Sequence, residues 1–495
     1  MGFNYLSAIV FLPVAGLVVI ALLSKPQPKT IKFIALAFTL AAFALSLAVF
    51  CLFDRSGGAI GRMQFEEKIL WIPAINAFYH LGVDGLSLPM VILMTFLGFL
   101  AVLVSWHIEL RPRQYFIWLL LLETSILGVF CSLDLVLFFL FWELELVPMY
   151  FLISIWGSGR KEYSAIKYVI YTLVGSAFML AGILSIYFAT GSLNMMELAG
   201  LALVKPVIPL AAMFFFLLVG FAIKLPVVPL HTWLPDAHTD APTAASVVLA
   251  GALLKMGGYG MIRLCVTIFP EVALHYAPLL VALAVVSVLY GAAVTLRQKD
   301  LKRLIAYSSV SHMGYVLLGI FALSQVSLTG ATLQMFSHGI ITGLLFAMVG
   351  LVYDKAHERN LDNLGGLARQ MPVIVVVFSI AGLASLGLPG TSGFAAEFIT
   401  FVGSFSSMAV AGIRAYTILG VFGIVLTAGY ILWMLQRVFY GPPLEKFNGV
   451  PDANNVDKVC IFSFVVAIML VGIYPAILTN VINLGIEPIA KLIGL

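Results

Sequence analysis

Six ionisable residues lie inside long apolar stretches of this 495-residue chain, where charge is least stable. They are Glu123, Glu143, Glu145, Lys224, Lys255 and Glu397. Insertion scales place the cost of an Asp, Lys or Arg at the centre of a membrane-spanning helix at roughly 2.5–3.5 kcal/mol. Packing alone seldom justifies repeating this cost for every one of them. We therefore expect these residues to handle charge inside a membrane.

Two of the acids stand close together in the stretch FWELELVPMY. Glu143 and Glu145 are two positions apart, so on a helix their side chains point about 200° away from one another. Because both cannot face the same partner, we expect one to face the interior of a helix bundle. The other would face a neighbouring helix or a water-filled cavity. For Glu145, a role limited to accepting hydrogen bonds from nearby polar groups stays open.

The two lysines stand beside residues that disturb a regular helix. Lys224 comes directly before the prolines of KLPVVP, and Lys255 lies among the glycines of GALLKMGGYG. Burial lowers the proton affinity of a lysine, whereas a nearby carboxylate raises it. Such a lysine can gain or lose a proton as its partner approaches or retreats. A static buried ion pair is the alternative interpretation.

Four histidines add groups that titrate close to neutral pH. His312, in SSVSHMGYVLLG, and His338, in LQMFSHGIITG, lie between Lys255 and Glu397 in the chain, which favours a proton relay over two histidines satisfied in the core. His231 and His238, in PLHTWLPDAHTDAPT, fall in a connection between spans. They either guard a proton entry or brace the helix ends, and the sequence leaves both interpretations open.

The composition indicates that membrane-spanning helices position these residues. Hydrophobic residues make up 62% of the chain and charged residues only 10%, which is typical of a polytopic, all-α membrane protein. A net charge of +4 is too small to favour nucleic-acid binding. Stretches of roughly 20 apolar residues, the length that crosses a bilayer, recur about fourteen times. We expect spans near 4–23, 31–53, 84–105, 113–132, 134–156, 163–190, 207–234, 241–269, 275–297, 301–322, 326–353, 372–402, 414–440 and 459–482.

The basic residues of the connections predict an orientation. The odd-numbered connections are rich in Lys and Arg; the even ones hold only Arg55, Arg62, Lys68, Lys205 and Arg414. Because cytoplasmic loops carry the excess of cations, both termini are expected outside the cell. The cations of the odd connections are Lys25, Lys29, Lys32, Arg111, Arg113, Arg160, Lys161, Lys167, Arg297, Lys299, Lys302, Arg303, Lys355, Arg359, Arg369, Arg437, Lys446 and Lys458.

The seventh and twelfth spans are interrupted. Prolines follow Lys224 in the seventh, and the stretch GLPGTSG precedes Glu397 in the twelfth. Two broken spans, five apart and each beside an ionisable residue, are typical of inverted-repeat transporters. We therefore expect three N-terminal helices over 1–110, a first repeat of helices 4–8 over 111–270, an inverted repeat of helices 9–13 over 271–443, and a last helix over 444–495.

Several motifs of redox and nucleotide chemistry are missing from the sequence. It has no GxGxxG after a strand and no Walker loop, and its four cysteines are scattered singly. We expect no cofactor or metal on this chain. Energy for moving charge would then come from elsewhere.

Long stretches of the chain resemble one known family. FWELELVPMYFLISIWG, GFAIKLPVVPLHTWLPDAHTDAPTAASVVLAGALLKMGGYG, LKRLIAYSSVSHMGYVLLGI and LQMFSHGIITGLLF are similar to the antiporter-like subunits of respiratory complex I, the proton-pumping NADH:quinone oxidoreductase. The resemblance covers nearly the whole chain. VPMY, the acid Glu397 where sister subunits usually place a lysine, and the absence of a long C-terminal lateral helix favour the M-type branch, the counterpart of mitochondrial chain four.

The resemblance implies a proton path along the centre of the membrane. Glu143 would pair with Lys224 as a gate, Lys255 would be the central lysine, and Glu397 the terminal acid. His312 and His338 would bridge these last two through water. Glu123 matches an acid often found in M-type chains, whereas Glu145 has no assigned place on the axis.

The resemblance also implies the surroundings of the chain. FMN, iron–sulfur clusters and quinone would reside on partner subunits, with L-type and N-type antiporter-like chains as neighbours. The protein would be a translocase subunit among the lipids of a bacterial plasma membrane. Alternatives are the D-type chain of a multi-subunit sodium/proton antiporter and a membrane subunit of an energy-converting hydrogenase or of a ferredoxin-driven plastid-type complex.

Overall fold

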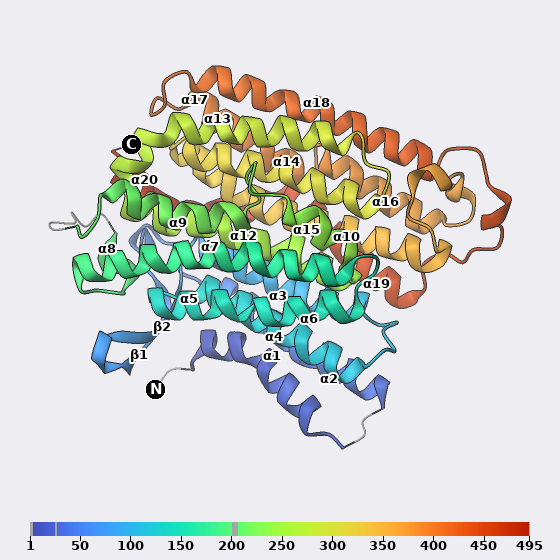
Figure 1. Cartoon of the computed structure of the whole chain (residues 1–495), viewed down its shortest axis with the longest axis horizontal. Coiled ribbons are helices and arrows are strands. Elements are labelled where there is room, and N and C mark those ends of the chain that lie inside the picture. The colour runs from blue at the N-terminus through green and yellow to red at the C-terminus, as the bar shows by residue number, and fades with distance from the viewer. Residues whose placement is uncertain (1–2, 25–26, 200–205, 495) are drawn as a thin grey trace.

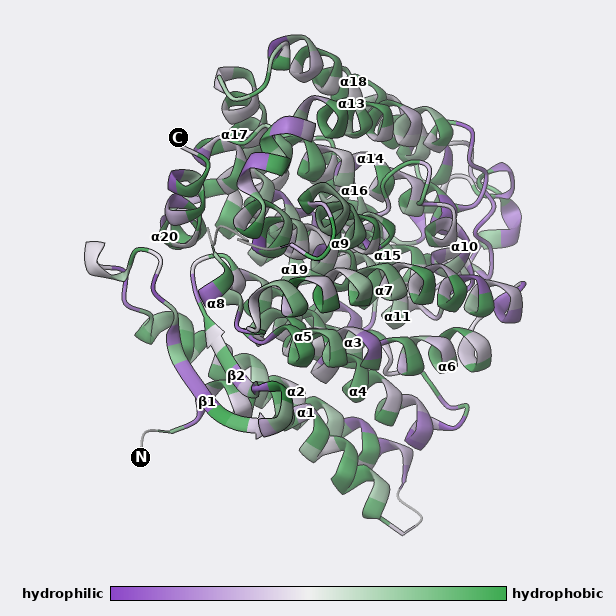
Figure 2. Cartoon of the chain, turned by 60° about the vertical axis from the view of Figure 1, so that its left-hand side comes forward, coloured by the Kyte–Doolittle hydropathy of each residue, from purple (hydrophilic) through white to green (hydrophobic). Residues whose placement is uncertain are grey.

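The chain folds into a bundle of apolar helices that run roughly parallel to one another (Figure 1). The computed structural model describes residues 3–24, 27–199 and 206–494. Lys25 and Lys205, two of the cations in the connections between spans, lie outside the described residues. Within these ranges, 12 helices are long and apolar enough to cross a membrane. Hydrophobic residues cover most of their length, and hydrophilic residues gather in the connections (Figure 2). The predicted helical membrane fold is confirmed, although not the exact number of spans.

The long and short helices follow one another with few long connections. Their bounds are α1 (Tyr5–Leu22), α2 (Pro28–Leu52), α3 (Ser87–Val104), α4 (Pro112–Cys131), α5 (Leu135–Leu144), α6 (Leu146–Trp156), α7 (Lys161–Thr190), α8 (Met195–Leu198), α9 (Leu210–Lys224), α10 (Trp233–Asp240), α11 (Thr243–Val248), α12 (Leu254–Gly260), α13 (Pro270–Thr295), α14 (Leu301–Phe321), α15 (Gln325–Ala356), α16 (Pro372–Ser385), α17 (Ser392–Ser406), α18 (Ile413–Val438), α19 (Asn455–Ile473) and α20 (Ala476–Leu492).

A β-hairpin between α2 and α3 departs from the all-helical prediction. Strand β1 (Gln64–Ile72) pairs antiparallel with β2 (Ala77–Val83). Asn76, at the turn, takes the left-handed conformation that asparagine tolerates better than most residues. The hairpin lies at the same end of the bundle as α8, α20 and both chain ends, on the left of Figure 1. We call this end the hairpin end.

The last predicted span, 459–482, is wrong at its C-terminal side. Helix α19 already ends at Ile473, and α20 begins beyond Pro475, whose ring cannot continue a preceding helix. α20 packs against the loop before α3 so closely that a Cβ on Gly85 would collide with the carbonyl oxygen of Val481. It is also joined to α15, because Thr329 Oγ1 donates a hydrogen bond of 2.6 Å to Asn483.

Both predicted helix breaks are present. α9 ends at Lys224 and the chain then runs through turns until α10 begins at Trp233. In the twelfth span, α16 ends at Ser385 and α17 begins at Ser392. The division into two inverted repeats, and the boundaries given above for the four regions, stay predictions.

The eighth span contains an irregularity that the sequence pattern does not reveal. Two π-helical segments, η3 (Leu249–Leu253) and η4 (Met261–Val266), lie on either side of α12, which carries Lys255. The whole span, Thr243–Val266, is buried. π-Helical turns are rare in proteins, and those that occur often lie at functional sites.

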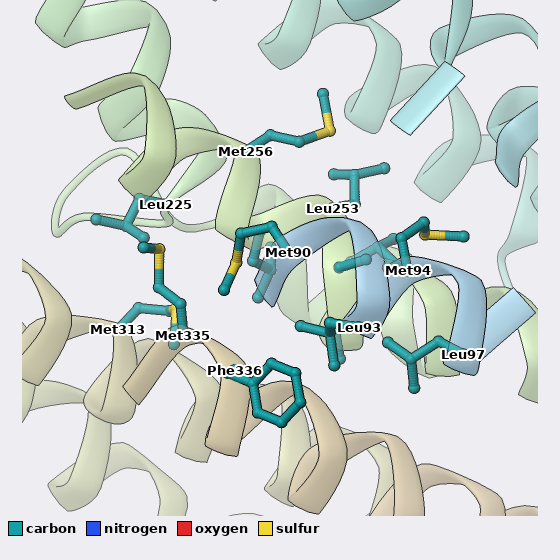
Figure 3. Packing of buried hydrophobic residues seen from close by; sticks show 14 of the residues in the cluster. Met90, Leu93, Met94, Leu97, Leu225, Leu253, Met256, Met313, Met335 and Phe336 are labelled. Atoms are coloured by element: carbon teal, nitrogen blue, oxygen red, sulfur yellow. The ribbon is translucent and has the colours of Figure 1, made fainter. Parts of the chain in front are cut away.

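Close apolar packing surrounds the lysine-bearing turn. Side chains of α3, among them Met90 and Leu93, lie between Leu253 and Met256 of the eighth span and Phe336 of α15 (Figure 3). All of these side chains except Phe336 are completely inaccessible to solvent. The packing excludes water from the sides of α12, so the polar groups that reach Lys255 decide its charge state.

Candidate proton-transfer site

The first cluster of buried charge is an ion pair between α9 and the boundary of α5 and α6. Lys224 Nζ contacts Glu145 Oε1, and the two side chains are 1% and 0% exposed. The predicted pairing of Lys224 with Glu143 is therefore wrong. Glu145 lies at the irregularity between α5 and α6, and its side of the helix faces α9.

Glu143 lies on the other side of the same helix, as the angle of about 200° requires. Its side chain is half-buried rather than fully enclosed. Its Oε1 atom is buried without a hydrogen-bond partner among the residues that the structure describes. Glu145 thus makes the direct contact with Lys224 that was predicted for Glu143, while Glu143 is half-buried beside Ser176 of α7.

Aromatic side chains enclose the Lys224–Glu145 pair. The hydroxyl of Tyr168, from α7, donates to Glu145 Oε2, and Lys224 Nζ lies 3.4 Å from the same hydroxyl. The ammonium also lies 5.5 Å from the centroid of Trp142, within the range of a cation–π contact. Because α9 ends at Lys224, the carbonyl groups of its last turn further favour a cation here.

The second cluster begins at Lys255, which has no carboxylate partner among the described residues. Its Nζ lies 2.8 Å from Nδ1 of His338 on α15, and it donates a second hydrogen bond to the carbonyl oxygen of Ala250. That carbonyl belongs to η3, where the π-helical turn displaces it from the ordinary helix pattern. Lysine and histidine cannot both be protonated at this contact, because a hydrogen bond needs one acceptor.

His338 continues the row towards the broken twelfth span. Its ring lies 5.6 Å from the ring of His312 on α14. His312 Nδ1 is 3.4 Å from Glu397 Oε1, and its Nε2 is 3.2 Å from Ser385 Oγ. The structure thus brings together Lys255, His338, His312 and Glu397, which are far apart in the sequence.

A small polar cavity runs along this row. It is lined by both histidines, Glu397, Gln334 and Ser385, and has a volume of about 10 Å³, the size of roughly one water molecule. Gln334 Oε1 and His338 Nε2 are buried beside it without a hydrogen-bond partner in the described part of the chain. The cavity and these free polar atoms would allow a proton to pass between the rings.

Glu397 also adjoins the surface of the protein. A groove of about 580 Å³ between α17 and α18 reaches Glu397, and its walls include the exposed side chain of Phe398. The acid therefore has the relay on one side and an open, largely apolar groove on the other. It occupies the end of the row.

Glu123 stands apart from both clusters. It is fully buried on α4 and contacts Gly98 of α3, where a Cβ would collide with its carboxyl group. Within the described residues, its Oε1 atom has no hydrogen-bond partner and its side chain joins no ion pair. The absence of a side chain at position 98 provides the space for it.

The remaining two histidines lie near the end of the bundle opposite the hairpin end. His231 packs against Tyr290, with ring centroids 5.3 Å apart, and His238 stacks on Phe346 at 4.5 Å. His238 belongs to α10, outside the long apolar helices. Burial, together with the charges of Lys302 and Lys255, lowers the pKa of His238 well below its usual range. The ring is thus neutral at pH 7, and both of its nitrogens are buried without a partner among the described residues.

Sequence reasoning missed a third buried charge cluster. Arg263 of η4 forms an ion pair of 2.6 Å with Asp84, and both are nearly inaccessible to solvent. Tyr168 was missed as well. Arg263 offered the same signal as the lysines, a cation in an apolar stretch, whereas Tyr168 is one of many tyrosines and gives no signal.

Comparisons with known proteins indicate the family to which the chain belongs. The family model described as "NADH:quinone oxidoreductase/Mrp antiporter, TM" matches residues 132–427. The chain is 40% identical to NADH-quinone oxidoreductase subunit M of Rhodobacter capsulatus, covering 97% of this chain and 95% of that protein. It is 41% identical to NAD(P)H-quinone oxidoreductase chain 4 1 of Synechococcus elongatus, covering 99% and 92%.

A solved structure is similar along its whole length. A chain of respiratory complex I from Thermus thermophilus with bound NADH superposes with a TM-score of 0.88 at 28% identity, covering 99% of this chain and 100% of that one. The matched region, 132–427, contains both buried lysines and Glu397. The chain therefore belongs to the NADH:quinone oxidoreductase/Mrp antiporter family of membrane subunits, among members of the subunit M (chain 4) type.

Proposed function

We propose that this chain moves protons across the membrane as the M-type subunit of a proton-pumping NADH:quinone oxidoreductase. The observation that carries the proposal is the row Lys255–His338–His312–Glu397, in which each side chain lies within contact distance, or about one water molecule, of the next. Every member can bind and release a proton, and the row ends at the protein surface.

The Lys224–Glu145 pair acts as the gate of this row. Two unit charges about 4 Å apart at an effective dielectric constant near 20 attract by about 4 kcal/mol. While Glu145 contacts Lys224, the lysine holds its proton; when the pair separates, the lysine releases it towards Lys255.

Glu143 is suited to receive the signal that separates the pair. It is half-buried on α5 beside Ser176 of α7 and near the charge of Lys224, so a charge on a neighbouring subunit of the membrane arm, N-type or L-type, would act on the pair through it. A charge brought near Glu143 would turn or shift the boundary between α5 and α6. His231 and His238 lie at the opposite end from the hairpin, the end that we assign to the cytoplasm, and His238 supplies protons to Lys255.

The redox chemistry takes place on partner subunits that carry FMN, iron–sulfur clusters and quinone. Protons leave from Glu397 towards the hairpin end, which faces outwards together with both termini in this orientation. The host membrane is a bacterial plasma membrane, and this chain contributes proton-binding groups rather than electrons.

The test is proton translocation by membrane vesicles that contain the assembled complex with Lys255→Met. We expect NADH-driven acidification of the vesicle lumen to fall at least tenfold, measured by quenching of a pH-sensitive dye. Lys29→Met, a change at an exposed lysine, is the matched control and should leave it unchanged. Full acidification by the Lys255→Met vesicles would refute the proposal. Acidification that requires sodium would instead favour the sodium/proton antiporter.

A further inference from the structure

We propose that the buried Asp84–Arg263 ion pair is a positioning device for Lys255, holding the eighth span in register and cancelling a positive charge close to the lysine. The inference rests on the proposed role of Lys255 in proton transfer. Arg263 lies in η4, eight positions after Lys255 on the same span. Neither Asp84 nor Arg263 belongs to the row described above.

Asp84 is built into its loop as a fixed anchor. Its Oδ1 atom accepts hydrogen bonds of 3.0 Å from the backbone N–H groups of Leu86 and Ser87, and of 2.6 Å from Arg263 Nη2. The Ser87 hydroxyl in turn accepts a hydrogen bond from the backbone N–H of Asp84. The carboxylate thus caps the start of α3 and, with the same oxygen, ties α3 to the eighth span.

Arg263 reaches back along its own helix towards the lysine. Its Nε donates to the hydroxyl of Tyr259 at 3.3 Å, and the guanidinium lies 5.4 Å from the centroid of the Tyr259 ring. Tyr259 follows Lys255 by four positions, so the two side chains share one face of α12. The tyrosine hydroxyl donates to the carbonyl oxygen of Phe130 at the end of α4, at 3.4 Å. A chain of contacts therefore runs from α3 and α4 to the turn that carries Lys255.

The loop that carries Asp84 is held from behind by α20. A Cβ on Gly85 would collide with Val481, and one on Gly485 would lie 2.6 Å from the backbone nitrogen of Leu86. Two glycines facing each other allow the helix to press directly on the loop. The loop that carries Asp84 is therefore held by α20 on one side and by the ion pair with Arg263 on the other. Such a fixed position is needed if Asp84 is to keep the eighth span in register.

Charge balance gives the pair an effect that a neutral contact would lack. At a rise of about 1.5 Å per residue, Arg263 lies about 12 Å from Lys255. An uncompensated charge at that distance, at an effective dielectric constant near 20, changes a proton equilibrium by about tenfold. His338 and His238 face Lys255 from α15 and α10, while Asp84 and Tyr259 contact Arg263. Among these, Asp84 is the residue that carries a full negative charge next to the guanidinium.

The experiment measures the pH dependence of NADH-driven proton translocation in vesicles with the assembled complex. In Asp84→Asn the guanidinium stays charged and unpaired, so the alkaline half-point should move about one pH unit lower. In Arg263→Met the remaining carboxylate should leave the half-point unchanged or move it higher. The double variant Asp84→Asn/Arg263→Met should return it to the wild-type pH. Equal half-points in all variants would overturn the inference.

Two further measurements keep the outcome decisive. If Asp84→Asn does not assemble, Arg263→Lys retains the charge but lacks the planar group that contacts Tyr259. It should keep the half-point while the number of protons moved per NADH falls severalfold, and wild-type coupling would overturn the positioning role. Lys255→Met separates the two proposals. If that variant still translocates protons, the proposed function fails. If Lys255→Met stops translocation but the Asp84 and Arg263 variants behave as wild type, the inference alone fails.

Discussion

Lys224 and Lys255 are both completely buried, but their partners differ in kind. Lys224 contacts a carboxylate and is surrounded by Tyr168 and Trp142, all of which favour its charged form. Lys255 contacts a histidine nitrogen and a backbone carbonyl, and no described carboxylate reaches it. The first lysine is built to hold a proton and the second to pass it on. A single chain thus contains a storage site and a transfer site made from the same residue type.

The largest effect is expected from a substitution that removes the carboxylate partner of Lys224, the feature that distinguishes the two lysines. Glu145→Gln should lower proton translocation by at least a hundredfold, because Lys224 loses the carboxylate whose attraction, about 4 kcal/mol at an effective dielectric constant near 20, holds its proton. Glu162→Gln, at an exposed acid on α7, is the matched control and should leave translocation unchanged. A larger loss in Glu143→Gln than in Glu145→Gln would show that the gate uses the other acid.

Interrupting the transfer site should have the next largest effect. His338→Phe keeps a ring of similar size but removes both nitrogens between Lys255 and His312. General acid–base groups contribute about 10²–10⁴-fold to the steps they assist, and we expect a loss of translocation at the lower end of this range. The exposed His275→Phe serves as the control. Unchanged translocation in His338→Phe vesicles would mean that protons bypass the row.

Tyr168→Phe tests the storage site more gently. A hydrogen bond to a charged group contributes about 1.5–3 kcal/mol, less where other partners remain. Because Glu145 and Lys224 still contact each other without the hydroxyl, we expect a fivefold to tenfold loss, with the alkaline limb of the pH profile moved to lower pH. A profile that keeps its shape while only the rate falls would assign Tyr168 to packing instead.

The smallest effect is expected at Glu123, which joins neither site. Glu123→Gln keeps the shape of the side chain in the space opposite Gly98, so translocation should stay within twofold of wild type. A loss greater than tenfold would reveal a third proton-binding position and would break the division into two sites.

The sequence predicted the residues of the site better than their contacts. An ionisable side chain in an apolar stretch is a strong signal, because its energetic cost requires a compensating role. It pointed to Lys224, Lys255 and Glu397, and to Glu143 ahead of Glu145, which was only a secondary candidate. Which acid faces Lys224 depends on how α5 is rotated in the bundle, and no spacing rule specifies that rotation. The chemistry was thus readable from residue types, whereas the pairing required tertiary structure.

The fold shows the same limit. Pro226 and the stretch GLPGTSG correctly predicted the two breaks, because proline and glycine act locally. The β-hairpin was missed because its two strands, 9 and 7 residues long, are too short to stand out as a pattern beside the apolar spans that flank them. α20 was merged with α19 because an amphipathic surface helix and the end of a span are both apolar. The π-helical segments depend on contacts with neighbouring helices, so hydrophobic periodicity cannot reveal them.

Those two π-helical segments give the eighth span more residues than a regular α-helix with the same number of turns. Each π-helical turn closes on the fifth following residue instead of the fourth and so accommodates more backbone. Deleting one residue between 249 and 253 would let η3 close as an ordinary α-helical turn, with Lys255 still directed at His338. The carbonyl oxygen of Ala250 would then return to the regular hydrogen-bond pattern of the helix and be lost to the ammonium group. The extra backbone of η3 therefore provides an acceptor for Lys255 and does not set the direction of its side chain.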